Sequence, residues 1–439
     1  MNQLFLQLMT HNMMPNRTLA PDIKDAVEFD VQLKPYHSYT LDNGTTVYSI
    51  DAGAEEVVMV ELVFFAGNWH EQKNIVAATT NHLLKNGTSK KDAFAINEHF
   101  EFHGAYLSRS CFNETATITL HCLNKHLSKL LPVVTELLTD AIFPESELAI
   151  YKQNQKQRLE VNLKKCDFVA NRLIDEYVYG FNHPYGKYTS ANDFNELQQQ
   201  DLIDFYKQYY TNGKCLVFVA GKLLPDTEAL LNKELGQLPF NKNEVVLQPI
   251  LQVPAIEKKY SITNDADGVQ TAIRIARPFP NRHHPDFSKV QILNNLFGGF
   301  FGSRLMSNIR EDKGYTYGIH SFIQNHLHNT AWLISTEAGR DVSDATISEV
   351  YKEMEILRNE IIDAEELDLV RNYMIGSLLG DLDGPFQIIA RWKNYILNNV
   401  TAEYFYNSLN TVRNVSAEEL QALAIKYLNP DEFYELKVV

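Results

Sequence analysis

The stretch QQDLIDFYKQYY at residues 199–210, followed by CLVFVAG at residues 215–221, decides the fold of this chain. The first segment has the apolar spacing of an amphipathic helix, and the second is a short apolar run typical of a buried strand. The same order of segments ends the chain, where SAEELQALAIKYL at 416–428 precedes FYELKVV at 433–439. A helix–strand pair that occurs twice indicates an internal repeat.

The repeat extends over most of the chain. An alternating strand pattern at 115–120 recurs at 330–335, and each copy is followed by a long amphipathic helix, near 126–140 and near 342–360. The matching landmarks lie 215, 218 and 218 residues apart: Thr115 with Thr330, Leu202 with Leu420, and Tyr209 with Tyr427. Such a steady offset predicts two tandem homologous α/β units.

The turn signals predict the kind of sheet that each unit contains. Asp-Asn-Gly at 42–44 lies between two alternating segments, which is a strong hairpin signal. VVMVELVFF from Val57 and VQTAIRIA from Val269 are typical of buried strands. The expected helices of the two copies lie near 74–86, 92–103, 286–297 and 302–310. We therefore expect an α+β fold, with a mixed, largely antiparallel sheet in each unit and helices packed on one face.

The repeat also suggests domain boundaries. Residues 31–225 form the first predicted unit and residues 256–439 form the second, after an N-terminal extension at 1–30. Residues 226–255 are predicted to be a linker, because the segment is polar and contains Pro239, Pro249 and Pro254.

Composition narrows the class of protein. The chain has 439 residues, of which 45% are hydrophobic and 22% are charged, as in ordinary soluble globular proteins. A net charge of −15 disfavours nucleic acids and anionic membrane surfaces as partners. We expect a cytoplasmic location, because the N-terminus lacks a signal-peptide pattern and no run is long enough to span a membrane. The four cysteines are scattered and are expected to be free thiols: Cys111, Cys122, Cys166 and Cys215.

Two segments resemble a known family. FFAG ending at Gly67, with His70-Glu71 and then IVAATTNHLLKNGT at 75–88, resembles the pitrilysin/insulinase metallopeptidases, and the mitochondrial processing peptidase is the closest architectural example. GGFFGSRLMSNIREDKGYTYGI at 298–319 resembles the signature of that family's second domain. The resemblance implies a metallopeptidase fold over nearly the whole chain.

In active members the first of these helices carries the inverted zinc motif H-x-x-E-H. Two histidines bind zinc, and the glutamate acts as general base on the zinc-bound water. The resemblance places these three positions at Ala78, Asn81 and His82. Ala78 has no donor atom, and the Asn81 amide does not accept a proton at neutral pH.

The third zinc ligand of the family, a glutamate, aligns with Asn162. Glu160 is two positions away, and a shift of about 200° around the helix turns it from that site. We therefore expect no cofactor bound by this chain and no metal ligands in it. Three histidine pairs have spacings compatible with a metal, but solvated or hydrogen-bonded imidazoles are the simpler interpretation: His99 with His103, His326 with His328, and His283 with His284.

The second-domain signature keeps an arginine and a tyrosine, which match as Arg310 and Tyr317. In the family the tyrosine donates a hydrogen bond to the developing oxyanion and the arginine binds substrate, which makes both candidate catalytic residues. A structural alternative is that Arg310 stabilises a helix C-terminus and that Tyr317 packs against the sheet. Gly298 and Gly299 are candidate substrate-binding residues, or they form a tight turn.

The resemblance implies a division of labour between two chains. We expect a non-catalytic, zinc-less subunit that binds peptide and supplies Arg310 and Tyr317 to the zinc site of a homologous partner, as a heterodimer or a homodimer. One alternative is a structural or peptide-binding protein of the same fold without a role in proteolysis. A third is an independent zinc peptidase with an atypical site.

Overall fold

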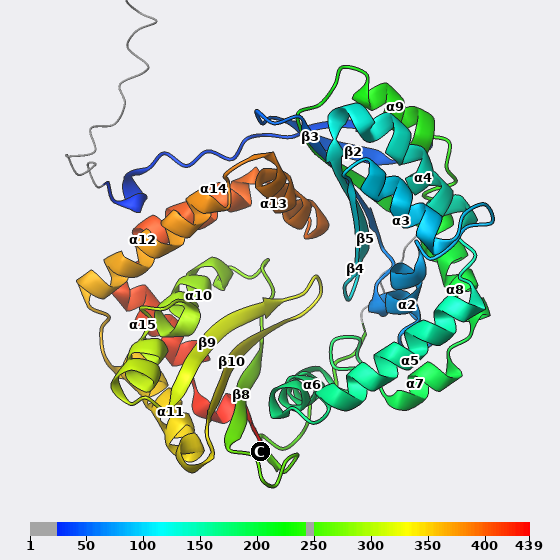
Figure 1. Ribbon diagram of the computed structural model, residues 1–439. Coiled ribbons are helices and arrows are strands. Elements are labelled where there is room, and N and C mark those ends of the chain that lie inside the picture. Colours follow the sequence, from blue (N-terminus) through cyan, green and yellow to red (C-terminus); the bar gives the residue numbers. More distant parts are fainter. Residues whose placement is uncertain (1–23, 243–249) are drawn as a thin grey trace, which may run out of the picture.

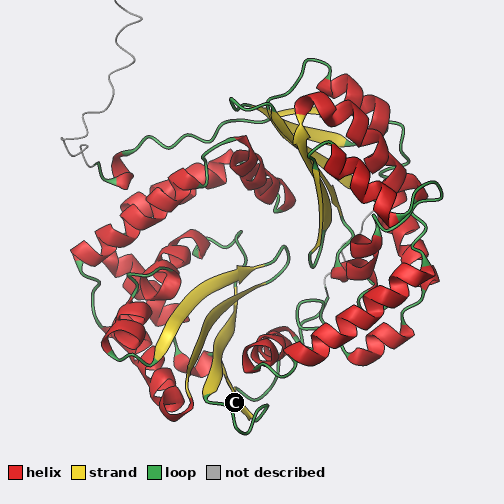
Figure 2. Ribbon diagram, in the orientation of Figure 1, coloured by secondary structure: helices red, strands yellow, loops and turns green. Residues whose placement is uncertain are grey.

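The computed structural model describes residues 24–242 and 250–439. The described strands form two sheets, one in each half of the chain, which lie on opposite sides of the centre of the molecule (Figure 1). Most of the helices lie on the outside of the sheets (Figure 2).

The two sheets share one topology, to which the first adds the edge strand β1. The first has the order β1-β2-β6-β3-β5-β4, and the second has the order β7-β11-β8-β10-β9. Only the β2–β6 and β7–β11 pairs are parallel. The strands of the first sheet are β1 (His37–Thr40), β2 (Thr46–Asp51), β3 (Val57–Phe64), β4 (Tyr106–Cys111), β5 (Ala116–Leu123) and β6 (Cys215–Gly221). Those of the second are β7 (Lys259–Ile262), β8 (Gln270–Phe279), β9 (Thr316–Asn325), β10 (Thr330–Gly339) and β11 (Tyr434–Val438).

The helices follow the same repeat. The first half contains α2 (Val76–Leu83), α3 (Ala93–Phe102), α4 (Leu127–Asp140), α5 (Glu145–Asn162), α6 (Cys166–Tyr179), α7 (Ala191–Glu196), α8 (Gln199–Tyr206) and α9 (Thr227–Leu235). The second contains α10 (Phe287–Asn294), α11 (Ser343–Asn359), α12 (Ala364–Gly380), α13 (Pro385–Leu397), α14 (Ala402–Asn414) and α15 (Ala417–Tyr427). Short 3₁₀ segments include η1 (Ala26–Glu28) and η2 (Asn68–His70), and π-helical turns include η5 (Asn295–Gly299) and η6 (Met306–Asp312).

The predicted fold class is confirmed. Each half has a mixed, largely antiparallel sheet whose own helices pack against one face. The Asp-Asn-Gly turn joins β1 to β2, and Gly44 takes the left-handed φ of +83° that such a turn requires. Strand β3 is almost entirely buried, as its apolar run predicts.

Part of the opposite face of each sheet is covered by a helix from the other half. Helix α6 packs on β8 and β11 of the second sheet, whereas its counterpart in the repeat, α13, packs on β2 and β6 of the first. Ala170 and Ile174 of α6 are buried beside Ala272 and Leu436. The two halves therefore complete each other's cores.

An ion pair with one buried partner accompanies each exchanged helix. Lys393 of α13 donates to both carboxylate oxygens of Glu61 on β3, at 2.7 Å each. On the other sheet the guanidinium of Arg274, on β8, pairs with Asp167 of α6. Glu61 lies opposite Phe218, and Arg274 lies opposite Leu436, which is 218 residues further along, so the two charges occupy equivalent positions.

The predicted linker, residues 226–255, starts too early. It contains α9, whose Leu231 and Leu235 are buried in the core of the first half. An amphipathic helix packed in this way is part of the first unit. Residues 243–249 of the linker and 1–23 of the N-terminal extension lie outside the described residues, and the other domain boundaries stay predictions.

The described end of the N-terminal extension contacts the second half. Segment η1 packs on α12, where the Val27 amide donates to Asn372 Oδ1 at 3.3 Å. All four cysteines are free thiols, as expected. Among the helices of residues 24–242 and 250–439, none combines the length and hydrophobicity needed to cross a membrane. A cytoplasmic location stays a prediction.

We predict that breaking the pair between Glu61 and Lys393 destabilises the protein. Lys393→Met leaves a carboxylate whose side chain is only 9% exposed without its cation, so the free energy of unfolding should fall by about 2–4 kcal/mol. The double variant Glu61→Leu with Lys393→Met removes both charges and should lose less than about 1 kcal/mol. Urea unfolding measures both values.

The matched control is Lys289→Met, which breaks the exposed pair of Lys289 with Glu419 and should cost at most about 1 kcal/mol. Equal losses for Lys393→Met and Lys289→Met would contradict a structural role for the buried pair.

Candidate functional site

Helix α2 carries the three positions of the degenerate zinc motif. Its N-terminus is capped by Glu71, whose carboxylate oxygens accept from the amides of Ile75 and Ala77, both at 3.2 Å. Burial raises the pKa of Glu71 to about 7. The two hydrogen bonds show that the Glu71 side chain satisfies backbone amides at the N-terminus of α2.

Asn81, in the position of the general base, is a structural residue. Its side chain is buried, and Nδ2 donates to the Thr117 carbonyl on β5 at 3.3 Å and to the Tyr210 hydroxyl at 3.1 Å. The amide thus joins α2 to the sheet. An amide that is engaged in this way has neither the charge nor the freedom to activate a water.

His82 and Ala78 lie four residues apart, on the less buried side of α2. The His82 ring packs against Tyr151 of α5, with ring centroids 4.8 Å apart. Burial lowers the pKa of His82, and the positive charges of Arg109 and Lys85 lower it further. The same two cations oppose the binding of a metal ion here.

Arg109 lies next to His82 of the motif. It extends from β4, and its guanidinium donates to the His82 carbonyl. Burial lowers the pKa of Arg109 to about 10, which leaves the group charged at neutral pH. Neither Arg109 nor Tyr151 was expected from the sequence, because only the packing of β4 and α5 against α2 brings them to His82.

Asn162 is not brought to His82. It is the last residue of α5, 11 residues beyond Tyr151, which corresponds to about 16 Å along the helix axis. Its Oδ1 accepts from Lys165 Nζ at 3.1 Å. Glu160 is exposed on the same helix.

The residues present do not fit a zinc ion. Catalytic zinc requires three protein ligands, and the motif supplies one imidazole. No group of three or more His, Cys, Asp or Glu side chains within residues 24–242 and 250–439 is placed to hold a metal.

The second-domain signature forms a different surface. Tyr317 lies near the start of β9, where Tyr317 and Gly318 together face the single residue Glu337 of β10, so the strand has a β-bulge. The Tyr317 side chain is 93% exposed, which excludes the alternative that it packs against the sheet. Bulges commonly re-aim a side chain at a functional site.

Arg310 lies beside Tyr317. Its Nε donates to the Tyr317 carbonyl at 3.0 Å, and its guanidinium lies 4.9 Å from the centre of the Phe301 ring. The side chain is 37% exposed. Both groups are therefore held at the protein surface with their polar ends accessible.

The glycines of this segment have a packing role. Gly298 is buried, and a Cβ there would lie 2.7 Å from Ser321 Cβ on β9. At Gly299 a Cβ would lie 2.8 Å from Asn295 Oδ1. These contacts favour the tight-turn interpretation, and substrate binding by the two glycines stays a prediction.

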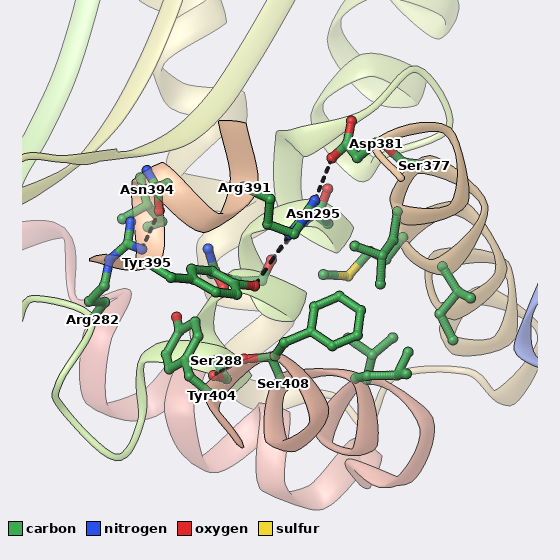
Figure 3. Close-up of a pocket in the computed structure, with 18 of the residues that line it drawn as sticks. Arg282, Ser288, Asn295, Ser377, Asp381, Arg391, Asn394, Tyr395, Tyr404 and Ser408 are labelled. Carbon is green, nitrogen blue, oxygen red and sulfur yellow. Dashed lines mark hydrogen bonds and ion pairs between the residues drawn. The ribbon is translucent and has the colours of Figure 1, made fainter. Parts of the chain in front are cut away.

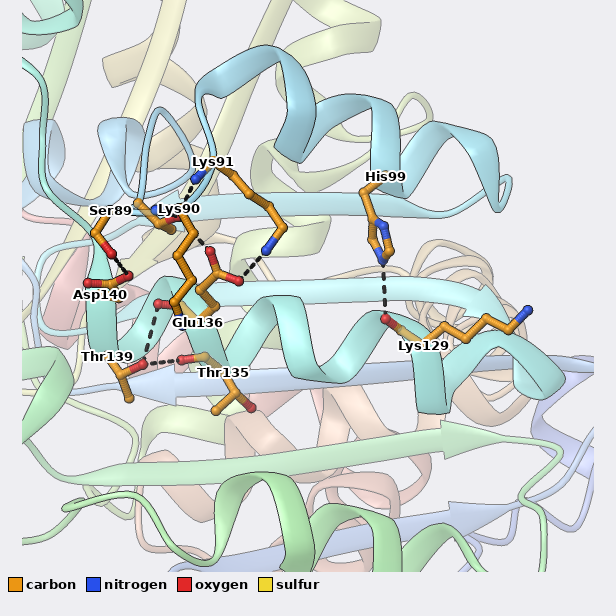
Figure 4. Close-up of polar contacts among 10 residues, drawn as sticks. Ser89, Lys90, Lys91, His99, Lys129, Thr135, Glu136, Thr139 and Asp140 are labelled. Atoms are coloured by element: carbon orange, nitrogen blue, oxygen red, sulfur yellow. Dashed lines mark hydrogen bonds and ion pairs between the residues drawn. The ribbon is translucent and has the colours of Figure 1, made fainter.

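The histidine pair on α3 has local partners. His99 Nε2 lies 3.2 Å from the Lys129 carbonyl on α4 (Figure 4). His103 Nδ1 lies 3.0 Å from the His99 carbonyl. In the loop before α10, His284 Nδ1 accepts from the Asp286 amide at 3.1 Å. His99, His103 and His284 are thus hydrogen-bonded, as the simpler interpretation predicts.

His326 and His328 belong to a larger cluster at the junction of the two halves. The β9–β10 turn that carries them meets the β4–β5 turn, where Asn113 Nδ2 lies 3.3 Å from His326 Nδ1 and Glu114 accepts from the Leu327 amide at 3.2 Å. Tyr185 donates to the same carboxylate and stacks on His326 at 4.0 Å.

Two further histidines join this cluster, His70 of η2 and the fully buried His183. Among the described residues, the Nε2 atoms of His70, His183, His326 and His328 have no hydrogen-bond partner. Burial lowers the pKa of His70 and of His326 to about 4, and it lowers those of His183 and His328 as well. The imidazoles are therefore neutral at pH 7, and the nearest anionic group is Glu114.

Comparison with known proteins agrees with the division of the chain into two halves. The sequence profile described as Insulinase (Peptidase family M16) matches residues 46–184, and the one described as Peptidase M16 inactive domain matches residues 196–374. The chain is 22% identical over 400 residues to the uncharacterized zinc protease YmxG of Bacillus subtilis, covering 90% of this chain and 96% of that one. It is 23% identical over 377 residues to the non-peptidase homolog YmxG of Helicobacter pylori, covering 82% and 84%.

Solved structures show the same fold. A peptidase M16 inactive domain from Pseudomonas fluorescens superposes with a TM-score of 0.83 at 23% identity, over 92% of this chain and 98% of the other. A protease from Helicobacter pylori gives a TM-score of 0.83 at 17% identity, over 93% and 100%.

Two homologous halves and a motif helix without a zinc ligand set define the class, a metallopeptidase-like protein. The chain belongs to peptidase family M16, the pitrilysin/insulinase family, and its second half matches the profile of that family's inactive domain.

We predict that restoring the motif residues does not restore a zinc site. The double variant Ala78→His with Asn81→Glu still lacks a third ligand, keeps Arg109 beside the motif and places a carboxylate where Asn81 is 3% exposed. Elemental analysis should find far less than one zinc per chain, and peptide cleavage should be absent. One tightly held zinc would show that a third ligand exists.

We also predict that acid destabilises the histidine cluster. The pKa values of His70 and His326 are lower in the folded chain than the usual 6.5, so the unfolded chain binds more protons between about pH 6.5 and pH 4. Stability is therefore lost as the pH falls through this window. The free energy of unfolding should drop by roughly 3–4 kcal/mol from pH 7 to pH 5 because of these two groups.

His326→Gln should remove about half of this pH dependence, whereas His283→Gln, at an exposed position, should leave it unchanged. Urea unfolding at both pH values measures the effect. The same slope in the His326→Gln and unmodified proteins would exclude His326 as a source.

Proposed function

We propose that this chain is the zinc-less subunit of a two-chain peptidase, in which it binds peptide and supplies Arg310 and Tyr317 to the zinc site of a homologous partner. The single observation that carries the proposal is the 93% exposure of Tyr317 at a β-bulge. A large aromatic side chain held out in this way gains nothing from burial, and a contact with a second chain or its substrate would explain it.

The chemistry of the two side chains supports this function. The Tyr317 hydroxyl is a hydrogen-bond donor suited to the oxyanion that develops on a scissile carbonyl. Arg310 Nε donates to the Tyr317 carbonyl and Nη1 lies 3.6 Å from Glu311 Oε1, and the 37% exposed guanidinium can also donate to a substrate carbonyl or carboxylate. The hydrogen bond from Arg310 Nε to the Tyr317 carbonyl holds the two residues side by side.

The kind of partner that cleavage requires follows from the missing zinc ligand and general base at Ala78 and Asn81. A second copy of this chain would bring the same Ala78 and Asn81, so a homodimer would bind peptide without cleaving it. Cleavage requires a partner with an intact H-x-x-E-H motif and its own zinc. The coupled activity is then that of a heterodimer, in which the metal and the general base come from the partner.

A structural or peptide-binding role without proteolysis is the second candidate. It is favoured by one observation, the description of the Helicobacter pylori relative as a non-peptidase homolog. In that case Arg310 and Tyr317 are dispensable for cleavage by any zinc-bearing homologue.

We expect Tyr317→Phe to slow peptide cleavage by the two-chain complex about 100-fold through kcat, because one oxyanion donor is lost. The experiment mixes the purified chain with the zinc-bearing homologue of the same genome and follows a quenched fluorescent peptide. The folded fraction should not change, since the hydroxyl is exposed. Tyr406→Phe on α14 is the control. Unchanged turnover with Tyr317→Phe would favour the structural role.

A further inference from the structure

A cavity of 380 Å³ lies in the second half, between α10, α12, α13, α14 and strand β9 (Figure 3). Its size is within the range of sites for small ligands. The charged residues of its walls are two arginines, Arg282 and Arg391, and one carboxylate, Asp381. No part of the function proposed above uses this cavity.

The charges of the lining do not balance. Arg391 is neutralised, since its Nη2 lies 2.9 Å from Asp381 Oδ2. Arg282 has no carboxylate partner within residues 24–242 and 250–439. The walls therefore carry one more positive charge than negative charge, in a chain whose net charge is −15.

Arg282 is held by neutral groups only. Its Nη1 donates to Asn394 Oδ1 at 2.6 Å. The Asn325 amide, oriented so that its nitrogen donates to Thr330 Oγ1, accepts from Arg282 Nε at 3.0 Å. Burial lowers the pKa of Arg282. Amides orient a guanidinium but do not neutralise it, and a partly buried cation without a counter-charge is the expected receptor for an anion.

The rest of the lining defines the body of the ligand. Ser288 and Ser408, whose hydroxyl oxygens lie 3.1 Å apart, add neutral donors near Tyr404. The lining also includes apolar side chains, among them Met374 and Phe405. A ligand that matches these walls has one negative charge at one end and an apolar group at the other.

We propose that this cavity binds a small carboxylate with an apolar body, in which the carboxylate pairs with Arg282. The chemistry is shared by the C-terminal residue of a peptide and by a free organic acid of similar size. The proposal does not depend on the function proposed for Arg310 and Tyr317, because it concerns different residues in a separate cavity.

The test is calorimetric titration of the full chain with N-acetylphenylalanine and with its amide, N-acetylphenylalaninamide. The acid should bind, and the amide should bind at least about tenfold more weakly, because it lacks the charge that pairs with Arg282. Absence of binding by the acid, or equal binding of acid and amide, would overturn the proposal.

Variants assign the effect to the residue. Arg282→Gln should weaken binding of the acid at least about tenfold, whereas Arg340→Gln, outside the cavity, should not. If Arg282→Gln unfolds, Arg282→Lys keeps the charge but loses the fork geometry, and it should bind the acid more weakly while still preferring it to the amide. Unchanged affinity in a folded Arg282→Gln chain would show that Arg282 only joins the β9–β10 turn to α13.

A second set of probes separates the two sources of ligand. A pentapeptide ending in phenylalanine is compared with its C-terminal amide and with 3-phenylpropionate. Tighter binding of the free-acid peptide supports a peptide C-terminus, and tighter binding of 3-phenylpropionate supports a small organic acid. Equal binding of the peptide acid and the peptide amide argues against a carboxylate site.

Discussion

The exchange of helices between the two halves is the constraint on which the rest of the structure depends. The central strands of each sheet are buried on both faces, but the helices of its own half cover only one of them. Helix α6 covers the second sheet and α13 covers the first. Because exposed apolar sheet surface is costly, neither half is complete without the other. The buried charges Glu61 and Arg274 add specificity, since each forms its ion pair with a residue of the incoming helix.

The position of the cavity around Arg282 and of the histidine cluster depends on this exchange of helices. Helix α13, which leaves the second half to cover the first sheet, also forms a wall of the cavity around Arg282. The loop after α6 brings His183 and Tyr185 to the meeting point of the β4–β5 and β9–β10 turns. The junction of the halves thus combines neutral histidines with one carboxylate, Glu114, and its electrostatics depend on the relative placement of both units.

The loss of the zinc motif goes beyond three substitutions. The Asn81 side chain hydrogen-bonds α2 to the sheet, and Arg109 places a positive charge beside His82. This arginine disfavours a metal ion at His82, because a guanidinium and a divalent cation repel each other. The Arg310 and Tyr317 side chains, in contrast, stay accessible and mutually positioned. Such a division is what a subunit that serves a partner's site would require.

The sequence by itself determined the duplication, the class of sheet and the missing zinc donors. Apolar periodicity and the 218-residue offset are local properties of the chain, and an alanine at position 78 has no donor in any fold. Only the tertiary structure decided which sheet α6 and α13 cover, that α9 belongs to the first core, and that Asn162 lies far from His82. It also placed Arg109, the histidine cluster and the unpaired Arg282, because contacts between residues distant in sequence depend on packing, which local patterns do not encode.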